Sequence, residues 1–106
     1  MDKNKFVSLT FDDGPNCTTT VRVLDVLKEF GVRASFFLIG QNICKENHSV
    51  ILRQLEQGCS VECHSWTHSH MAELSGGQIK SEIQKTCSLI QKITGKSPAF
   101  FRPPYI

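Results

Sequence analysis

The chain has 106 residues, enough for one modest domain with a single hydrophobic core. Hydrophobic residues make up 40% of the sequence and charged residues 21%, which is ordinary for a globular protein. The formal charge of +2 is small and the basic residues are scattered, which argues against a nucleic-acid-binding or membrane-surface protein. No apolar run approaches the length that crosses a bilayer.

The N-terminus and the cysteines bear on the cellular compartment. Residues 1–5 lead directly into a short apolar run and lack the hydrophobic stretch of a signal peptide, so we expect a mature start here or an intracellular protein. The cysteine count is odd, so at least one thiol stays free or pairs with another chain, which suits a reducing compartment. The cysteines are Cys17, Cys44, Cys59, Cys63 and Cys87.

The first half of the chain shows two strand patterns around a helical one. Side chains alternate in character along residues 5–11, which predicts a strand. Residues 18–30 place apolar side chains on one helical face, and Gly31 is well placed to end that helix. Residues 33–39 are a second apolar run, rich in Phe, and predict the next strand.

The second half continues the alternation. Residues 49–57 predict a shorter helix that ends at Gly58, and residues 59–63 predict a third strand. A long helix follows, and it ends at Gly95. Residues 98–102 predict a fourth strand, which runs into two prolines.

The long helix carries both a start signal and a buried stripe. Ser75 and Gln78 have the spacing of a capping box, in which each side chain bonds the other residue's backbone N–H. Apolar residues then recur every three or four positions, which predicts one buried face. They are Ile79, Ile83, Cys87, Ile90 and Ile93.

Strands and helices that alternate in this way predict an α/β fold with parallel strands joined by right-handed crossovers. The sequence stops directly after the fourth predicted strand and offers no helix to cover it. We therefore interpret residues 1–106 as one incomplete domain.

Polar clusters follow three of the four predicted strands, where active-site residues of parallel α/β folds gather. The first cluster contains Asp12 and Asp13. Adjacent carboxylates repel, so a buried pair needs a cation or a shared proton, and a metal held by one leaves the other free as a base. The alternative is a simple turn, because Asp-Asp-Gly-Pro consists of residues that favour turns.

The second cluster contains His64 and His68. Histidines at positions i and i+4 share one face of a helical turn and can ligate one metal, although two unrelated surface histidines would give the same pattern. Together with Asp13 they form a His₂-carboxylate set that fits catalytic zinc or another divalent transition metal.

The third cluster follows the last predicted strand. Arg102 could orient a nearby carboxylate such as Asp12. Pro103 and Pro104 stiffen the loop, so the amide N–H of Tyr105 could point at a developing oxyanion. The alternative is a surface arginine followed by a proline stop.

In order, these clusters resemble the three N-terminal motifs of the polysaccharide deacetylase family, also called the NodB-homology domain or carbohydrate esterase family 4. The motif segments are TFDDGP at residues 10–15, HSWTH at 64–68 and RPPY at 102–105. The likeness continues through residues 23–27 and 34–40, so it covers nearly the whole chain.

The resemblance implies the first half of a distorted (β/α) barrel of the NodB-homology type. It also implies that Asp13, His64 and His68 bind a divalent metal, commonly zinc, with cobalt or another transition metal as an alternative.

The resemblance further assigns catalytic roles. Asp12 would be the base that deprotonates a metal-bound water, and Arg102 would hold Asp12 in place. The backbone amide of Tyr105 would stabilise the tetrahedral oxyanion.

The implied activity is metal-dependent hydrolysis of N-acetyl groups on an N-acetylglucosamine polymer of the chitin or peptidoglycan type. The expected partner is therefore a carbohydrate polymer and not a nucleic acid, and the sequence leaves location and oligomeric state open. A catalytically inactive glycan-binding relative, or a fold fragment, is the alternative.

The chain departs from the family pattern in several places. Cys63 precedes the metal-ligating His64, where its thiol could compete as a ligand, and Ile106 follows Tyr105 where glycine is usual. The family's fourth and fifth motifs are missing, and no histidine follows His70 to protonate a leaving amine. We therefore expect the 106-residue chain alone to be inactive or nearly so.

One rival interpretation is a structural zinc module built from Cys59, Cys63, His64 and His68. Neighbouring strand residues point to opposite faces, so Cys63 and His64 would not readily share a metal. The spacing also lacks the long gap between the ligand pairs of zinc fingers.

Overall fold

The computed structural model describes residues 4–105 and contains a parallel sheet with the strand order β1-β2-β3. The strands are β1 (Thr10–Asp12), β2 (Ser35–Leu38) and β3 (Ser60–Cys63). The register places Phe36 beside Phe11 on one side and Val61 on the other. Since helical crossovers join these parallel neighbours, the α/β prediction is confirmed.

The helices between the strands follow the predicted order. The α-helices are α1 (Thr19–Phe30), α2 (His48–Glu56) and α3 (Gly76–Thr94). Short 3-10 turns η1 (Gly40–Asn42), η2 (Lys45–Asn47) and η3 (Met71–Glu73) lie in the loops. Within residues 4–105, no helix combines the length and the apolar character that a membrane span needs.

The predicted helix ends are confirmed by their backbone geometry. Gly31 and Gly95 cap α1 and α3 with φ of 63° and 76°, the left-handed region that glycine enters without a Cβ clash. At the start of α3, the Ser75 Oγ accepts from the Gln78 N–H at 3.2 Å, and Gln78 Oε1 accepts from the Ser75 N–H at 2.8 Å. This is the capping box read from the sequence.

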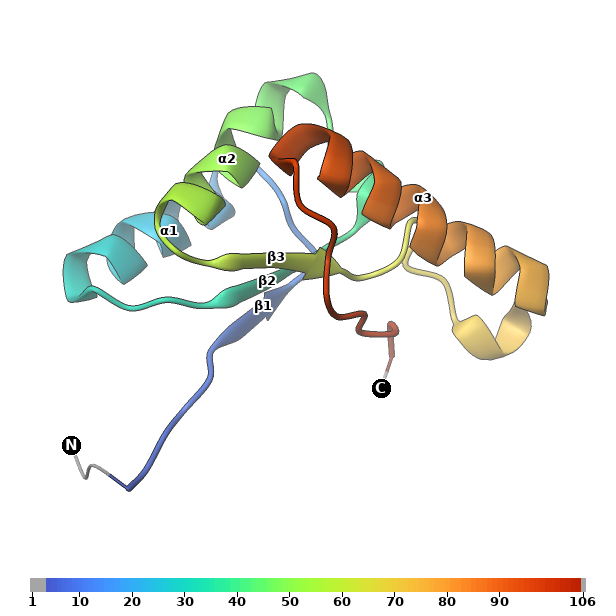
Figure 1. The fold of residues 1–106 in the computed structure, drawn as a ribbon, viewed down its shortest axis with the longest axis horizontal. Coiled ribbons are helices and arrows are strands. Elements are labelled where there is room, and N and C mark those ends of the chain that lie inside the picture. The colour runs from blue at the N-terminus through green and yellow to red at the C-terminus, as the bar shows by residue number, and fades with distance from the viewer. Residues whose placement is uncertain (1–3, 106) are drawn as a thin grey trace.

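The three α-helices pack against one face of the sheet, and this face holds the core (Figure 1). Alternate residues of β2 and β3 contribute to it because successive strand side chains point to opposite faces. The core residues include Leu24, Leu27, Phe36, Leu38, Val50, Ile51, Val61 and Ile90. The opposite face carries Phe37 and Glu62, and the segment that leads to the C-terminus crosses in front of β3 (Figure 1).

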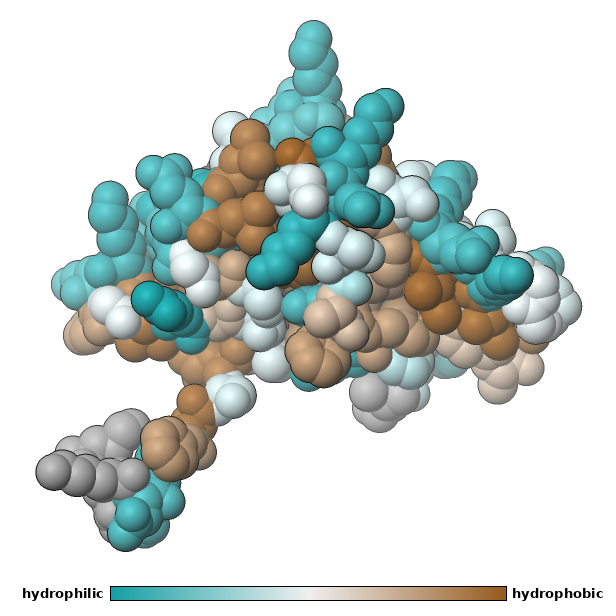
Figure 2. All heavy atoms as spheres, viewed as in Figure 1, coloured by the Kyte–Doolittle hydropathy of each residue, from teal (hydrophilic) through white to brown (hydrophobic). Residues whose placement is uncertain are grey.

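The first strand is shorter than the alternation predicts. Pairing begins only at Thr10, opposite Ser35, because β2 starts there and offers residues 5–8 no partner. The Phe6 and Val7 side chains are 90% and 76% exposed, and Figure 2 shows apolar side chains along this protruding segment. The prediction of a strand over residues 5–9 is therefore wrong.

The fourth predicted strand is reduced to one parallel bridge between Cys63 and Phe101. The bonds that flank it are the Cys63 N–H to the Phe100 carbonyl at 3.1 Å and the Arg102 N–H to the Cys63 carbonyl at 3.0 Å. The N–H groups of Ala99 and Phe100 instead donate to the carboxylate of Glu62, at 2.7 and 3.0 Å. Because a side chain takes these donors, a regular ladder does not extend along residues 98–102.

Candidate metal centre

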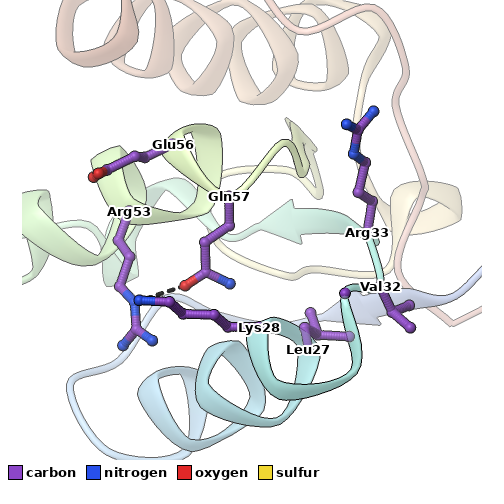
Figure 3. Close-up of a pocket in the computed structure, with 8 residues that line it drawn as sticks. Leu27, Lys28, Val32, Arg33, Arg53, Glu56 and Gln57 are labelled. Carbon is purple, nitrogen blue, oxygen red and sulfur yellow. Dashed lines mark hydrogen bonds between the residues drawn. The ribbon is translucent and has the colours of Figure 1, made fainter.

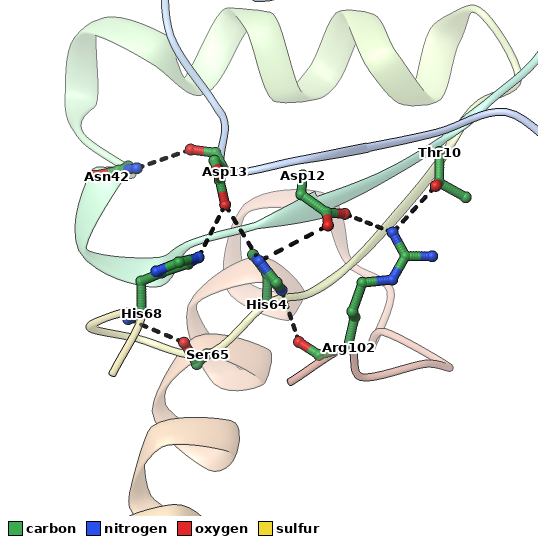
Figure 4. A network of polar contacts seen from close by, with 8 residues as sticks. All are labelled: Thr10, Asp12, Asp13, Asn42, His64, Ser65, His68 and Arg102. Carbon is green, nitrogen blue, oxygen red and sulfur yellow. Dashed lines mark hydrogen bonds and ion pairs between the residues drawn. The ribbon is translucent and has the colours of Figure 1, made fainter. Parts of the chain in front are cut away.

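The three polar clusters of the sequence meet at the carboxyl end of the sheet. Asp13 directly follows β1, His64 directly follows β3, and Arg102 follows the bridge at Phe101. Figure 4 shows these side chains converging from separate segments of the chain. Parallel strands bring their carboxyl ends to one edge, so residues far apart in sequence become neighbours there.

Asp13 lies between the two imidazoles. Its Oδ1 is 3.2 Å from His64 Nε2 and 3.2 Å from His68 Nε2. The candidate ligand atoms of the three residues all lie within 4.8 Å of one another. Within residues 4–105, no other group of three or more histidine, cysteine and acidic side chains meets this condition. The His64 side chain is 4% exposed and that of Asp13 is 63% exposed, so the cluster opens to solvent on the Asp13 side.

The His64 ring is oriented by the backbone. Its Nδ1 lies 2.7 Å from the Arg102 carbonyl oxygen, and a carbonyl only accepts, so Nδ1 carries the proton and donates it. The lone pair of Nε2 then faces Asp13, as a metal-ligating imidazole requires. Two imidazoles and one carboxylate with an open solvent side match the donor set of a catalytic divalent transition metal.

The two histidines do not lie on a helical turn. Residues 64–70 form an irregular loop in which Ser65 and His68 have positive φ, 70° and 61°. The Ser65 Oγ accepts from the His68 N–H at 3.1 Å and closes the loop. The expectation of a shared helical face is wrong, although the two rings still come together with centroids 5.0 Å apart.

Asp12 is held apart from Asp13 by Arg102. The guanidinium Nη1 donates to Asp12 Oδ1 at 2.6 Å and to Thr10 Oγ1 at 3.1 Å. The same group lies 4.2 Å above the ring of Phe37, which fixes it over the sheet. Asp12 Oδ2 is 3.9 Å from His64 Nε2, so this carboxylate borders the cluster from the strand side.

Backbone geometry separates the adjacent carboxylates. Asp12 ends β1 in register with Phe37, on the face where Arg102 lies. Asp13 turns away with φ of 77°, and its carbonyl oxygen accepts from Asn42 Nδ2 at 2.9 Å. A cis peptide bond joins Gly14 to Pro15 just beyond.

Tyr105 contributes its ring to the rim of the cluster. The ring stacks on His70 at 3.7 Å between centroids and meets His68 edge-on at 4.8 Å. Its φ of 60° shows a sharp bend in the chain at this point. Ile106, where the family usually has glycine, lies outside the described residues.

Two buried carboxylates support the site, and neither was singled out from the sequence. Glu62 anchors the segment that leads to Arg102, and Glu82 of α3 accepts hydrogen bonds from the histidine loop. In α3 the buried residues are Glu82, Thr86 and Ile90, whereas Ile79 and Ile83 are only half-buried. The sequence did contain a sign of this, because Glu82 and Thr86 are four residues apart and so share a helical face. A search for apolar periodicity alone passes over such a polar pair.

Cys63 does not join the metal cluster. It is fully buried on the core side of β3, and burial raises the pKa of its thiol to about 12. Within the described part of the chain, no metal-competent group combines Cys59 or Cys63 with the histidines, so the structural zinc module finds no support. The thiol of Cys63 also does not compete as a ligand here.

A pocket between the C-terminal ends of α1 and α2, just before β2 begins, borders a different polar network (Figure 3). There Arg53 Nη2 donates to Asp25 at 2.6 Å, and Arg53 Nε donates to Gln57 Oε1 at 2.8 Å. Gln57 Nε2 donates in turn to the Leu24 carbonyl at 3.0 Å. These bonds join α1 to the C-terminal end of α2 beside the pocket.

The fold and the cluster define an α/β protein with a His₂-carboxylate centre at the carboxyl end of a parallel sheet. The sequence profile of the family described as polysaccharide deacetylase matches residues 1–106. The chain therefore belongs to the polysaccharide deacetylase family, as the three motifs suggested.

Individual relatives agree with this assignment. The chain is 47% identical to a bifunctional xylanase/deacetylase of Pseudobutyrivibrio xylanivorans, over 96% of this chain and 17% of that protein. It is 40% identical to the peptidoglycan-N-acetylglucosamine deacetylase PgdA of Listeria monocytogenes, over 96% of this chain and 22% of that one. The chain thus spans about a fifth of the length of these relatives.

A solved structure gives the same result for the fold. A family 4 acetyl xylan esterase from Clostridium thermocellum, in complex with a cobalt ion, superimposes with a TM-score of 0.91 and 44% identity. The match covers 94% of this chain and 49% of that one. The predicted NodB-homology architecture is therefore confirmed, and the chain spans about half of that structure.

Proposed function

We propose that this chain forms the metal-binding part of a deacetylase that acts on an acetylated carbohydrate polymer. The observation that carries the proposal is the split between the two aspartates. Asp13 faces both imidazoles at 3.2 Å, while Asp12 is held 2.6 Å from Arg102 and stays outside the ligand set. One carboxylate is thus free for proton transfer beside a metal site.

Each residue then has a distinct task. Asp13, His64 and His68 hold a divalent transition metal, with zinc as the first candidate because of the His₂-carboxylate donors. A divalent metal bound there supplies Lewis acidity, which polarises an acyl carbonyl and lowers the pKa of water.

Asp12 and the C-terminal segment supply the remaining chemistry. Asp12 takes a proton from the attacking water, and Arg102 keeps its carboxylate in position through the 2.6 Å bond. The backbone N–H of Tyr105 stabilises the oxyanion that develops on the acetyl oxygen. Water adds to the carbonyl carbon, and the bond from that carbon to the sugar nitrogen then breaks. The nitrogen takes up a proton and leaves as the free amine, and the acetyl group is released as acetate.

The proposed substrate is an N-acetylglucosamine polymer of the chitin or peptidoglycan type. The 40% identical PgdA of Listeria, a peptidoglycan-N-acetylglucosamine deacetylase, supports this choice. A second candidate is O-acetylated xylan, because the 47% identical relative is a xylanase/deacetylase and the 44% identical structure is an acetyl xylan esterase.

Cobalt(II) titration tests the metal site directly. We expect weak d–d bands in the visible spectrum of the chain that vanish in an Asp13→Ala/His64→Ala variant, because both changes remove ligands. A Cys59→Ala variant is the matched control, since Cys59 is buried away from the cluster, and it should keep the bands. An intense near-ultraviolet thiolate band that survives in the double variant would mean cysteine capture and would contradict the proposed site.

A further inference from the structure

The loop that carries both imidazoles contains little regular structure of its own. Residues 64–70 are irregular, and Ser65 and His68 have positive φ values, which residues other than glycine rarely adopt. Such backbone conformations persist only where surrounding contacts enforce them. The source of those contacts therefore decides how well the two imidazoles are placed.

A buried carboxylate from α3 supplies the principal contacts. Glu82 Oε2 accepts from the Trp66 N–H at 2.7 Å and from the Thr67 N–H at 2.9 Å. Glu82 Oε1 accepts from the hydroxyl of Thr67. These backbone N–H groups belong to the residues between Ser65 and His68, so Glu82 is hydrogen-bonded to the centre of the loop.

The carboxylate is nearly excluded from water. Glu82 is 9% exposed, and within residues 4–105 no lysine, arginine or histidine forms an ion pair with it. A buried charge without a counterion is costly unless hydrogen bonds replace its hydration. Hydrogen bonds to a charged acceptor are stronger than neutral ones. The three donors of the loop therefore stabilise the buried carboxylate, and the carboxylate in turn holds the loop.

The neighbouring turn of α3 clamps the Trp66 ring. The amine of Lys85 lies 4.1 Å above the ring, and the ring also packs against Gly40, where an added Cβ would fall 2.2 Å from Trp66 Cε3. The indole is thus in contact with both α3 and the turn that begins at Gly40. The contacts of α3 fix the loop through its backbone and through this ring.

We propose that Glu82 is a positioning residue that sets the spacing of His64 and His68 to Asp13 by fixing the backbone of the loop between the two histidines. The proposal rests on the proposed metal site. Glu82 is not itself a ligand, because both of its oxygens are engaged with the loop and it lies outside the ligand cluster.

The first test uses amide hydrogen exchange on the metal-free chain. We expect the N–H groups of Trp66 and Thr67 to exchange slowly in the wild type and in Glu82→Gln, whose amide oxygen still accepts from both. In Glu82→Ala both should exchange at the rate of exposed amides. Fast exchange of both in the wild-type chain would overturn the proposal without any variant.

The second test measures cobalt(II) affinity and the d–d spectrum. Glu82→Ala should weaken binding by about 10- to 100-fold, the usual effect of losing a group that orients metal ligands, and should shift the bands. Glu82→Gln should rescue both. Ile90→Ala, which opens the core of the same helix without touching the loop, should leave the dissociation constant near the wild-type value in the folded chain.

The outcomes separate this inference from the metal site itself. Equal cobalt affinity for Glu82→Ala and Ile90→Ala would refute the role of Glu82 while the metal site stands. A wild-type chain that binds no cobalt at Asp13 and the histidines would refute the metal site instead, and amide exchange alone would then decide whether Glu82 fixes the loop.

Discussion

Asp12 and Asp13 are chain neighbours with opposite surroundings, and this contrast defines the chemistry of the site. Asp12 belongs to a strand, so its side chain projects from the sheet face where Arg102 stacks on Phe37. Asp13 has left the strand with φ of 77° and turns toward the imidazoles. Two like charges therefore avoid each other by pairing with different partners.

Arg102 has two roles, because its side chain holds Asp12 and its backbone carbonyl orients His64. Removal of the side chain should separate them. Arg102→Ala loses the bond to Asp12 and the stacking over Phe37, so we expect a loss of about 1–2 kcal/mol in the free energy of unfolding. Cobalt affinity should change little, because His64 Nδ1 is held by the carbonyl of residue 102, which the variant keeps. Chemical denaturation and cobalt titration measure the two quantities. A large loss of cobalt affinity would contradict this division.

The Cys63 thiol predicts a dependence of stability on alkaline pH. Burial raises its pKa from 9.0 to about 12, so between these values the unfolded chain loses a proton that the folded chain retains. The contribution of this thiol to the free energy of unfolding is fully present below pH 9 and is lost as pH rises toward 12. Unfolding of the metal-free chain should therefore become easier over this range, and less so in Cys63→Ala.

Alkylation gives a second measure of the same thiol. At pH 8, native chain should react at the exposed Cys17 and Cys44 and spare Cys63, whose thiol is buried and protonated. Rapid alkylation of Cys63 in the folded chain would show that the end of β3 is accessible to solvent, and it would contradict the burial of this thiol.

At the scale of elements, the site depends on close contact between the loops and α3. The 3-10 turn η1 begins at Gly40, which contacts both Trp66 of the histidine loop and Thr86 of α3. The Gly40 N–H also donates to the Ser65 carbonyl at 2.9 Å. One small residue thus allows a turn, a loop and a helix to meet.

Gly40→Ala should disrupt this junction. The added Cβ would lie 2.2 Å from Trp66 Cε3 and 2.6 Å from Thr86 Oγ1, so the indole must move. We expect a loss of about 1–3 kcal/mol in unfolding free energy, the usual cost of overpacking, together with weaker cobalt binding. Gly76→Ala is the matched control, because its Cβ meets nothing within 4 Å at the start of α3. The prediction is wrong if both variants melt at the same temperature.

At the scale of the whole molecule, the sheet has two unlike faces. One face is buried under the three helices, and the other carries Phe37, over which Arg102 lies. The C-terminal segment passes in front of β3, to which Phe101 forms a bridge (Figure 1). The match to the cobalt-bound esterase covers about half of that structure, 49% of its length. The interpretation of residues 1–106 as one incomplete domain has no test in these comparisons and stays a prediction.

The activity of the 106-residue chain by itself is a further prediction at this scale. We expect the 106-residue chain alone to release acetate from chito-oligosaccharides at the background rate, because no histidine follows His70 to protonate the leaving nitrogen. A chimaera in which this chain replaces the matched half of the cobalt-bound esterase should release acetate. An Asp13→Ala chimaera is the control and should be inactive. Clear acetate release by the chain alone would contradict the expectation.

The sequence by itself determined the order of strands and helices, the helix ends at Gly31 and Gly95, and the candidate ligands Asp13, His64 and His68. These follow from local rules, since periodicity, glycine caps and motif spacing are all properties of short segments. The resemblance to the family likewise came first from three short motifs, and the profile match over residues 1–106 then showed the family.

The tertiary structure alone decided how those residues meet. It replaced the helical turn of the histidines by an irregular loop, and it gave Glu62 and Glu82 their roles as buried acceptors of backbone N–H groups. It also shortened the first and fourth strands. Each of these features depends on a partner that is distant in sequence, and periodicity within one segment carries no information about such a partner.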